Sequence, residues 1–286
     1  MKKNSIRSIN FHIWKPCNFK CKYCFATFED SKEEYKDKEK LNKSEMLQII
    51  DEIVAYGFEK ITFVGGEPLL CPWLDELIIH AKKGGLTTMI VTNGYLLKEN
   101  WLKKVAANLD WVTISIDTLK DSQMRAIGRS NGNKNISEER YLKRINLLHK
   151  YRIKFKMNTV VNAINYKEDL SSFVKQTKPE RWKVFQVLPI KNQRVEIDDM
   201  KVSEDSFNTF VKRHEEKGIL VIAENNNAMI NSYLMIDPLG RFFDNTNFEL
   251  NYSQSILEVG FEKAMNQIKV SEKKYFDRGG EYNWSK

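Results

Sequence analysis

Three cysteines near the start of the chain have a spacing that could bind iron. Cys17, Cys21 and Cys24 form the pattern C-x-x-x-C-x-x-C, and Tyr23 stands just before the last cysteine. Three thiolates this close together can hold three irons of a [4Fe–4S] cluster and leave the fourth iron open to a small molecule. The spacing therefore predicts a catalytic cluster. Zinc with Cys71 as a fourth ligand is the alternative, but structural zinc sites usually come as two close pairs, so Cys71 is expected to be a packed thiol.

The segment before the cysteines has the pattern of a strand. Ile9, Phe11 and Ile13 alternate with the polar residues Asn10 and His12, and such alternation is typical of a strand with one buried face. We therefore expect the cysteines on the loop that leaves this first strand.

Strand-like and helix-like segments alternate through the first two thirds of the chain. The strands are expected at Ser8–Trp14, Lys60–Val64, Thr88–Thr92, Trp111–Ile116, Phe155–Val161 and Arg181–Leu188. The helices between them are expected at Ser44–Tyr56, Trp73–Lys83, Lys98–Leu109, Ser137–Tyr151 and Lys167–Thr177, with Ser44 and Ser137 as N-caps. This alternation predicts parallel strands with right-handed crossovers, in a partial barrel or an open sheet.

The rest of the chain has a weaker pattern. Helices are expected at about Ser203–Lys217 and near Ser255–Ile268, with a mixed region between them and a polar tail at the end. We divide the chain into a barrel of residues 1–190 and a C-terminal extension of residues 191–286 that closes the mouth of the barrel.

Several strands carry polar side chains on the face opposite their apolar one. Lys156 and Asn158 share a face, Lys183 lies in the middle of its strand, and none of these residues has an acidic companion on its strand face. A buried lysine is costly without an anion. The strands therefore predict a cationic cavity inside the fold that holds a charged ligand, whereas a solvated edge strand would explain any one of them alone.

Composition narrows the classes of protein. The chain has 286 residues and a net charge of +8, which favours an anionic partner. The lysines are scattered rather than gathered with aromatic residues, so we expect no direct binding to nucleic acid. No apolar run approaches the ~20 residues that cross a membrane. Four cysteines without a secretory segment indicate a reducing, cytoplasmic location, and we expect a monomer.

The second strand ends in a motif that could approach a ligand. Gly65, Gly66 and Glu67 precede Pro68. Two glycines allow close approach of the backbone, and Glu67 brings a carboxylate to the carboxyl end of a strand, where barrels bind ligands. Alone, the motif could be an ordinary turn before a helix.

Together with the cysteine loop, this motif resembles the radical S-adenosylmethionine (SAM) superfamily. The resemblance extends over nearly the whole chain to the viperin family of antiviral nucleotide-modifying enzymes and its short microbial members. It is carried by Asn-Phe-His ahead of Cys17 and by Gly128-Arg129, Arg181-Trp182-Lys183-Val184-Phe185-Gln186, Ser232-Tyr233-Leu234 and the final segment from Arg278. The resemblance implies a partial (βα)6 TIM-like barrel with a C-terminal extension.

The resemblance also implies residues for the cofactors, a [4Fe–4S] cluster and SAM. The cysteines would hold the cluster, and the Gly-Gly-Glu segment would bind the amino group of the methionine part of SAM. Asn93 and Ser115 would meet ribose hydroxyls, Arg129 would pair with the SAM carboxylate, and Tyr23 would pack beside the adenine.

For the substrate, a ribonucleoside triphosphate, the resemblance implies a second set of residues. Lys156, Lys183 and Arg278 would surround the triphosphate, while Asn10 and Asn158 would meet sugar hydroxyls or phosphate oxygens. Tyr233, a candidate catalytic residue, would lie near the ribose or base, and His12 is a candidate for proton transfer, although either side chain could simply belong to the core.

The implied reaction yields a 3′-deoxy-3′,4′-didehydro nucleotide. A 5′-deoxyadenosyl radical would take the C4′ hydrogen, and loss of the 3′ hydroxyl as water and reduction by one electron would follow. An external one-electron donor is required. CTP is the favoured substrate, with UTP and GTP as alternatives. The competing hypotheses are a peptide-modifying or activating radical SAM enzyme, and a non-enzymatic protein that binds metal or nucleic acid.

Overall fold

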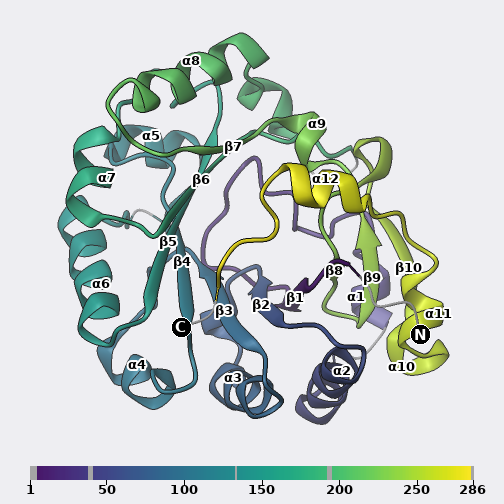
Figure 1. Cartoon of the computed structure of the whole chain (residues 1–286). Coiled ribbons are helices and arrows are strands. Elements are labelled where there is room, and N and C mark those ends of the chain that lie inside the picture. Colours follow the sequence, from purple (N-terminus) through teal and green to yellow (C-terminus); the bar gives the residue numbers. More distant parts are fainter. Residues whose placement is uncertain (1–4, 38–40, 133, 192–194, 285–286) are drawn as a thin grey trace.

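The computed structural model describes residues 5–37, 41–132, 134–191 and 195–284 (Figure 1). Its centre is a curved sheet of six parallel strands that pair in the order of the sequence. These strands are β1 (Ser8–Trp14), β2 (Lys60–Gly65), β3 (Thr87–Thr92), β4 (Trp111–Ser115), β5 (Lys154–Val161) and β6 (Arg181–Gln186). They confirm the six expected strands to within about two residues at each end.

Four shorter strands extend this sheet at its two edges. β7 (Ile222–Glu224) pairs in parallel with β6, and β8 (Met235–Ile236) pairs in parallel with β1. β9 (Arg241–Asp244) and β10 (Asn251–Ser255) follow as antiparallel strands. The resulting order is β10-β9-β8-β1-β2-β3-β4-β5-β6-β7. Since β7 and β10 are both edges, the barrel is partial, as expected.

Helices connect the strands, and most of those between the six parallel strands surround the outer face of the curved sheet, as Figure 1 shows. They are α1 (Glu34–Asp37), α2 (Lys43–Ala55), α3 (Leu74–Lys83), α4 (Glu99–Val105), α5 (Asp121–Ala126), α6 (Glu138–Lys150), α7 (Ser171–Thr177), α8 (Glu204–Glu215), α9 (Asn226–Met229), α10 (Ile256–Val259), α11 (Phe261–Met265) and α12 (Glu272–Asp277). Three short 3₁₀ turns complete the described elements: η1 (Pro68–Leu70), η2 (Val195–Met200) and η3 (Thr246–Phe248). In the described part of the chain, no helix has the length and apolar character needed to span a membrane.

Local sequence explains most helix boundaries and one error. Ser137 caps α6 as expected, because its hydroxyl accepts a hydrogen bond from the amide of Arg140. The prediction that Ser44 caps α2 is wrong. Asn42 is the N-cap, and it forms a reciprocal capping box with Glu45, which satisfies two free amides of the first turn instead of one.

The C-terminal extension differs from the expectation in two ways. The helix expected near residues 255–268 is split into α10 and α11 at Gly260, whose φ is +85°. The expected polar tail includes α12, and its last described residue, Trp284, is only 6% exposed.

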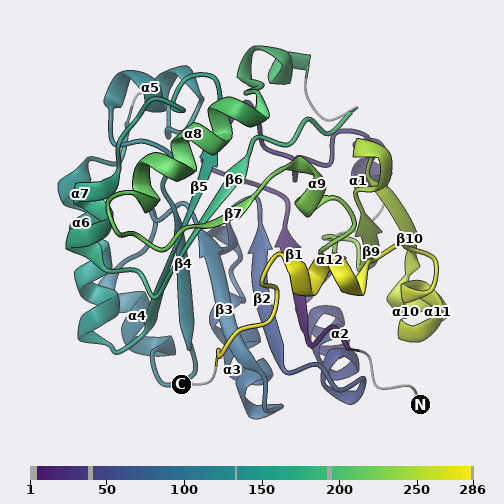
Figure 2. The same cartoon turned by 45° about the horizontal axis from the view of Figure 1, so that its top comes forward.

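The last residues of the extension lie at the amino-terminal end of the barrel rather than at its mouth. The indole Nε1 of Trp111, the first residue of β4, donates to the Trp284 carbonyl oxygen at 2.9 Å. Lys60, the first residue of β2, donates to the Tyr282 hydroxyl at 3.0 Å. Figure 2 shows this segment crossing the sheet after α12. The tail therefore closes the end of the barrel opposite to the cysteine loop.

Candidate functional site

The three motif cysteines lie together at the carboxyl end of β1. Cys17, Cys21 and Cys24 form no disulfide and line one cavity of about 390 Å³, here called the cysteine cavity, and Gly66 lines it too. Cys71 is 5% exposed within the main hydrophobic core and is absent from the described lining of this cavity. The prediction that Cys71 is a packed thiol is confirmed.

The donor set of the cysteine cavity fits an iron–sulfur cluster better than a zinc ion. Among the described residues, no three His, Cys, Asp or Glu side chains converge on a single metal position. A structural zinc needs four ligands around one point. In a [4Fe–4S] cluster each thiolate binds a different iron, so three separated thiols around a roomy cavity suit the cluster.

Two glycine segments hold the cysteine loop by direct backbone contact. The Gly66 amide donates to the Trp14 carbonyl oxygen at 2.6 Å, and the Lys20 amide donates to the Gly128 carbonyl oxygen at 3.1 Å. A Cβ at Gly66 would lie 2.3 Å from the Lys15 carbonyl oxygen, and one at Gly128 would lie 2.2 Å from that of Lys20. Any side chain at either glycine would push the loop away. These glycines therefore let the chain approach itself, in addition to the approach to a ligand that the sequence predicted.

Arg129 is buried beside the cysteine loop and has one donor left over. Its Nη1 lies 2.9 Å from a carboxylate oxygen of Asp117 and 3.7 Å from the Cys21 sulfur, and its Nη2 donates to the Ser115 carbonyl oxygen at 2.6 Å. The Nε atom is buried without a hydrogen-bond partner. A guanidinium held on one side by Asp117, with an unsatisfied N–H on another, suits an additional anion such as a carboxylate.

Asp117 organises this corner of the site, and sequence reasoning missed it. Its side chain is fully buried, it pairs with Arg129, and it accepts hydrogen bonds from the Tyr23 hydroxyl and from the Val160 amide. It shares the strand face of Thr113 and Ser115, which was the only signal in the sequence. Tyr23 thus packs beside the cluster loop with its hydroxyl fixed by Asp117.

Glu67 faces into the protein rather than into open space. Its carboxylate accepts hydrogen bonds from the Thr92 hydroxyl at 2.6 Å, from the Asn93 amide at 2.9 Å and from the Leu69 amide at 3.1 Å. Burial raises its pKa to about 7, and these hydrogen bonds oppose the rise. Glu67 therefore fixes the loop after β3, where the Asn93 side chain donates to Asn18 of the cysteine loop at 2.8 Å.

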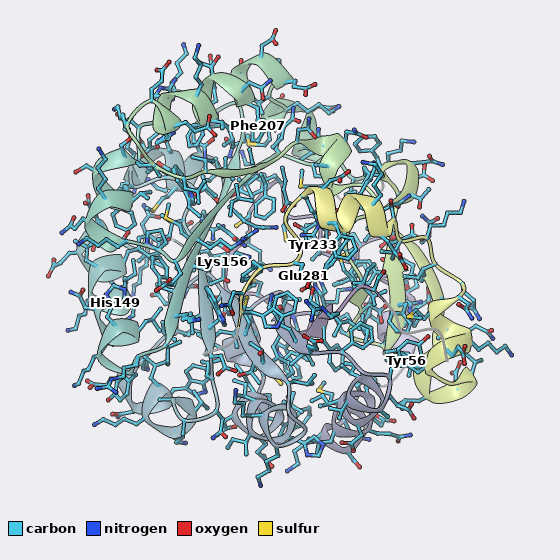
Figure 3. The ribbon with its side chains drawn as sticks, in the orientation of Figure 1. Tyr56, His149, Lys156, Phe207, Tyr233 and Glu281 are labelled. Atoms are coloured by element: carbon cyan, nitrogen blue, oxygen red, sulfur yellow. The ribbon has the colours of Figure 1, made fainter. Side chains whose placement is uncertain are left out.

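A second cavity, here called the cationic cavity, lies inside the barrel and encloses about 90 Å³. Among the described residues that line it, every charged side chain is a cation: Lys60, Lys156, Lys183 and Arg278. All four are buried. In Figure 3, Lys156 and Tyr233 lie near the middle of the ring of helices. The predicted cationic interior is therefore present, and Lys60, which sequence reasoning left out, belongs to it.

Polar side chains that could meet a sugar line the same cavity. Asn10 comes from β1 and Asn158 from β5, and the amide oxygen of Asn158 is buried without a hydrogen-bond partner. In the sheet, Asn158 lies opposite Ser115 on one side and Lys183 on the other. Asn158 thus lies between Ser115, which the resemblance assigns to SAM, and Lys183, which it assigns to the substrate.

One carboxylate, Glu224, lies behind the cationic cavity and was not foreseen. It is fully buried, and it accepts hydrogen bonds from Lys183 and from the Tyr233 hydroxyl, while Arg278 lies 3.6 Å away. The expectation that Lys183 has no acidic companion on the face of its own strand holds, since β6 contains no Asp or Glu, but a neighbouring strand supplies a carboxylate. Glu224 comes from β7, a three-residue strand too short for the sequence pattern to reveal.

Burial and mutual repulsion lower the pKa values of the lysines that line the cationic cavity. The pKa values of Lys60 and Lys156 are well below the ordinary value, chiefly because both are buried and also because Lys183 is near each of them. Burial lowers the pKa of Lys183 to about 8, although Glu224 opposes this shift. An anion in the cavity would reverse these shifts.

His12 points inward but does not belong to the described lining of either cavity. Its ring makes edge-to-face contacts with Phe25, Phe28 and Phe243 at centroid distances of 5.2–6.1 Å. Burial lowers its pKa to about 3, so the ring is neutral near pH 7. The sequence left open whether His12 transfers a proton or belongs to the core. This environment favours a residue of the core.

Comparisons with known proteins agree with this geometry. The family model described as the radical SAM superfamily matches residues 13–175, more than half of the chain. An S-adenosylmethionine-dependent nucleotide dehydratase of Flammeovirga pacifica is 47% identical over 98% of this chain and 97% of its own length. One from Lacinutrix mariniflava is 48% identical over 99% of this chain, which spans only 60% of that longer protein. The zebrafish (Danio rerio) S-adenosylmethionine-dependent nucleotide dehydratase RSAD2 is 34% identical over 98% of this chain.

Solved structures show the same fold at low sequence identity. The enzyme anSMEcpe with bound AdoMet and a Kp18Cys peptide superposes with a TM-score of 0.70 at 15% identity, over 95% of this chain and 82% of that one. Streptococcus suis SuiB bound to S-adenosylmethionine gives a TM-score of 0.62 at 16% identity, over 82% of this chain and 59% of that one. At this identity the likeness concerns the fold alone, and it does not favour a peptide substrate here.

Proposed function

Because the chain belongs to the radical SAM superfamily and, within it, to the S-adenosylmethionine-dependent nucleotide dehydratases, we propose that it converts a ribonucleoside triphosphate to its 3′-deoxy-3′,4′-didehydro analogue. The observation that carries this proposal is the cationic cavity. It is lined by Asn158 of β5, the strand that pairs with β4, where Ser115 is assigned to SAM. The register Ser115–Asn158–Lys183 supports this adjacency.

The residues at the mouth would hold the cofactors. Cys17, Cys21 and Cys24 would bind the cluster, and the Nε–H of Arg129 would bind the SAM carboxylate. The segment Gly65-Gly66-Glu67 would position SAM through its backbone, since the Glu67 carboxylate is already engaged, while Tyr23, Asn93 and Ser115 would contact its nucleoside part. When bound and reduced by an external donor, these cofactors supply the radical that takes a hydrogen atom from C4′.

The residues inside the barrel would hold the substrate with its phosphates toward the amino-terminal end. Lys60 is the first residue of β2, and Lys156 and Lys183 are the third residues of their strands. The cations therefore lie toward the amino-terminal ends of the strands, whereas the cysteine loop lies at the carboxyl end of β1. Asn158 and Asn10 would then meet the ribose hydroxyls. This arrangement leaves C4′ facing the mouth of the barrel.

Tyr233 is the residue we assign to protonation of the leaving 3′ hydroxyl. Its hydroxyl lines the cationic cavity, donates to Glu224, and lies 3.4 Å from the Lys183 Nζ. Burial, reinforced by Glu224, raises its pKa well above the ordinary value, so it stays protonated.

The preference for CTP rests on the resemblance to viperin alone.

Anaerobic turnover tests the proposal directly. Reconstituted protein is incubated with SAM and dithionite, and with CTP, UTP, GTP or ATP in separate reactions. Mass spectrometry then measures 5′-deoxyadenosine and the dehydrated nucleotide. We expect a triphosphate to stimulate 5′-deoxyadenosine formation and to lose one water, while the matching nucleoside does neither.

Two variants separate the roles. Lys183→Ala should raise the KM for the triphosphate and leave uncoupled SAM cleavage largely intact. Tyr233→Phe should lower the yield of dehydrated nucleotide per SAM cleaved. Equal stimulation by nucleoside and triphosphate, or by neither, would instead indicate another radical SAM substrate.

A further inference from the structure

The charged side chains around the cationic cavity are nearly all positive, which is unusual for a protein interior. Arg181 joins the four lining cations, because it lies opposite Lys156 in the register of β5 and β6 and contacts Gly279, which lines the cavity. Arg181 donates to the Gly279 carbonyl oxygen at 2.6 Å, and its Nε is buried without a partner. Among the described residues, these five cations have one buried carboxylate, Glu224, within their cluster. When all are ionised, the cluster has a net charge of four positive units.

The cavity offers a divalent metal ion no free carboxylate. The only carboxylate within the described cluster is that of Glu224, and its two oxygens already contact Lys183, Arg278 and the Tyr233 hydroxyl. No Asp or Glu occurs among the described residues that line the cavity. Magnesium in nucleotide sites is usually held by one or two protein carboxylates together with the phosphates.

We infer that this site binds the triphosphate as the metal-free anion and discriminates against its magnesium complex, an inference that rests on the proposed function. A fully ionised triphosphate carries roughly four negative charges, which match the four net positive charges of the cluster. Magnesium neutralises two of the phosphate charges, so its complex would leave buried cations without partners, and uncompensated buried charge is costly. The ammonium and guanidinium groups take the place that magnesium has in carboxylate-containing nucleotide sites.

Equilibrium binding of CTP at a series of free magnesium concentrations tests this inference, with ionic strength held constant by sodium chloride. Only the metal-free fraction of the nucleotide would be competent. When magnesium holds roughly nine-tenths of the CTP, the apparent Kd should therefore rise about tenfold. An exchange-inert chromium(III) complex of CTP, in which the metal cannot leave, should fail to compete. An apparent Kd that stays constant or falls with magnesium would overturn the inference.

Two variants check that the cavity causes the discrimination. Lys156→Gln removes one cation from the cluster, so it should weaken binding of metal-free CTP more than binding of the chromium(III) complex and should shrink the difference between the two Kd values. Lys104→Gln, at an exposed lysine at the end of α4, should leave the difference unchanged. If Lys156→Gln kept the full difference, the discrimination would not originate in this cluster. If none of CTP, UTP, GTP and ATP bound, with or without magnesium, the proposed function would fail first.

Discussion

At the scale of single residues, the site depends on side chains whose charge is held in place by a buried partner. Arg129 is fixed by Asp117, and Lys183 by Glu224. Removing one member of such a pair leaves a buried charge uncompensated and costs roughly 3–5 kcal/mol. Substitutions at these pairs therefore need a stability measurement beside the functional one.

Arg129→Lys should weaken SAM binding without emptying the cluster site. Lysine keeps a positive charge near Asp117, but it lacks the Nε–H that is unsatisfied in the wild-type protein. Loss of one charge-assisted hydrogen bond should weaken binding roughly tenfold to a hundredfold. Equilibrium binding of SAM to reconstituted protein measures the effect, with iron content as the control. Unchanged SAM affinity would remove Arg129 from the SAM site.

Triphosphate binding should take up protons. In the empty cavity, burial lowers the pKa of Lys183 to about 8 and those of Lys60 and Lys156 well below the ordinary value. A bound polyanion raises these pKa values, so the lysines bind their protons more tightly in the complex than in the free protein. Affinity should therefore fall as the pH rises from about 7.5 through the pKa of Lys183, a range where the phosphates, with a second pKa near 6, are already ionised.

Calorimetric titration of CTP in two buffers of different ionisation enthalpy counts these protons. Lys183→Gln should take up fewer protons than the wild-type protein at the same pH. No exchange would show that the lysines are already charged in the free protein, and net proton release would contradict the prediction outright.

At the scale of elements, the cysteine loop is held between two turns that contain glycine. One follows β2 and the other follows α5, and each donates or accepts a backbone hydrogen bond with the loop. The loop itself has little regular structure. Its geometry therefore comes from these neighbours rather than from its own sequence.

Gly66→Ala should lower iron incorporation while the protein stays folded. The new Cβ would meet the carbonyl oxygens of Lys15 and Pro16 at 2.3 and 2.5 Å, so the cysteine loop must move. Iron per chain after anaerobic reconstitution is the measurement, with circular dichroism to confirm the fold.

Two control variants accompany Gly66→Ala. Gly57→Ala places alanine at φ +90° with nothing within 4 Å of its Cβ, and it should cost roughly 1–2 kcal/mol of stability and keep its iron. Cys71→Ala should keep its iron as well. Iron loss in the controls equal to that of Gly66→Ala would indicate general destabilisation instead.

At the scale of the whole molecule, the tail closes the end of the barrel where the cations lie. Trp284 packs with Met89 and Trp111, and Glu281 pairs with Arg7 near the start of β1. Residues from both ends of the chain thus enclose the triphosphate end of the proposed site.

Trp284→Ala should lower stability and nucleotide affinity together. Removing a buried tryptophan typically costs 3–5 kcal/mol, and the loss would release Tyr282 from Lys60. SAM binding at the opposite end should be unaffected. Urea unfolding and CTP binding under folding conditions test this, with Phe276→Ala as the control, because Phe276 is 44% exposed and should change little. A stable variant with normal CTP affinity would show that the tail does not support the cavity.

Much of this protein could be predicted from its sequence because the signals are local. The cysteine spacing lies within eight residues, and the period of two along each strand placed Lys156 and Asn158 on the inner face. The alternation of strands and helices gave the partial barrel, since parallel neighbours need crossovers.

Only the tertiary structure decided which distant residues share the cavities. Lys183 and Glu224 are 41 positions apart, and Lys60 and Tyr282 are 222 apart. No periodicity relates such pairs, because their proximity depends on how the sheet curves and where the tail lies. The local sequence also could not predict that the Glu67 side chain is buried, since its carboxylate accepts hydrogen bonds from the end of β3 and the loop after it as well as from its own neighbours.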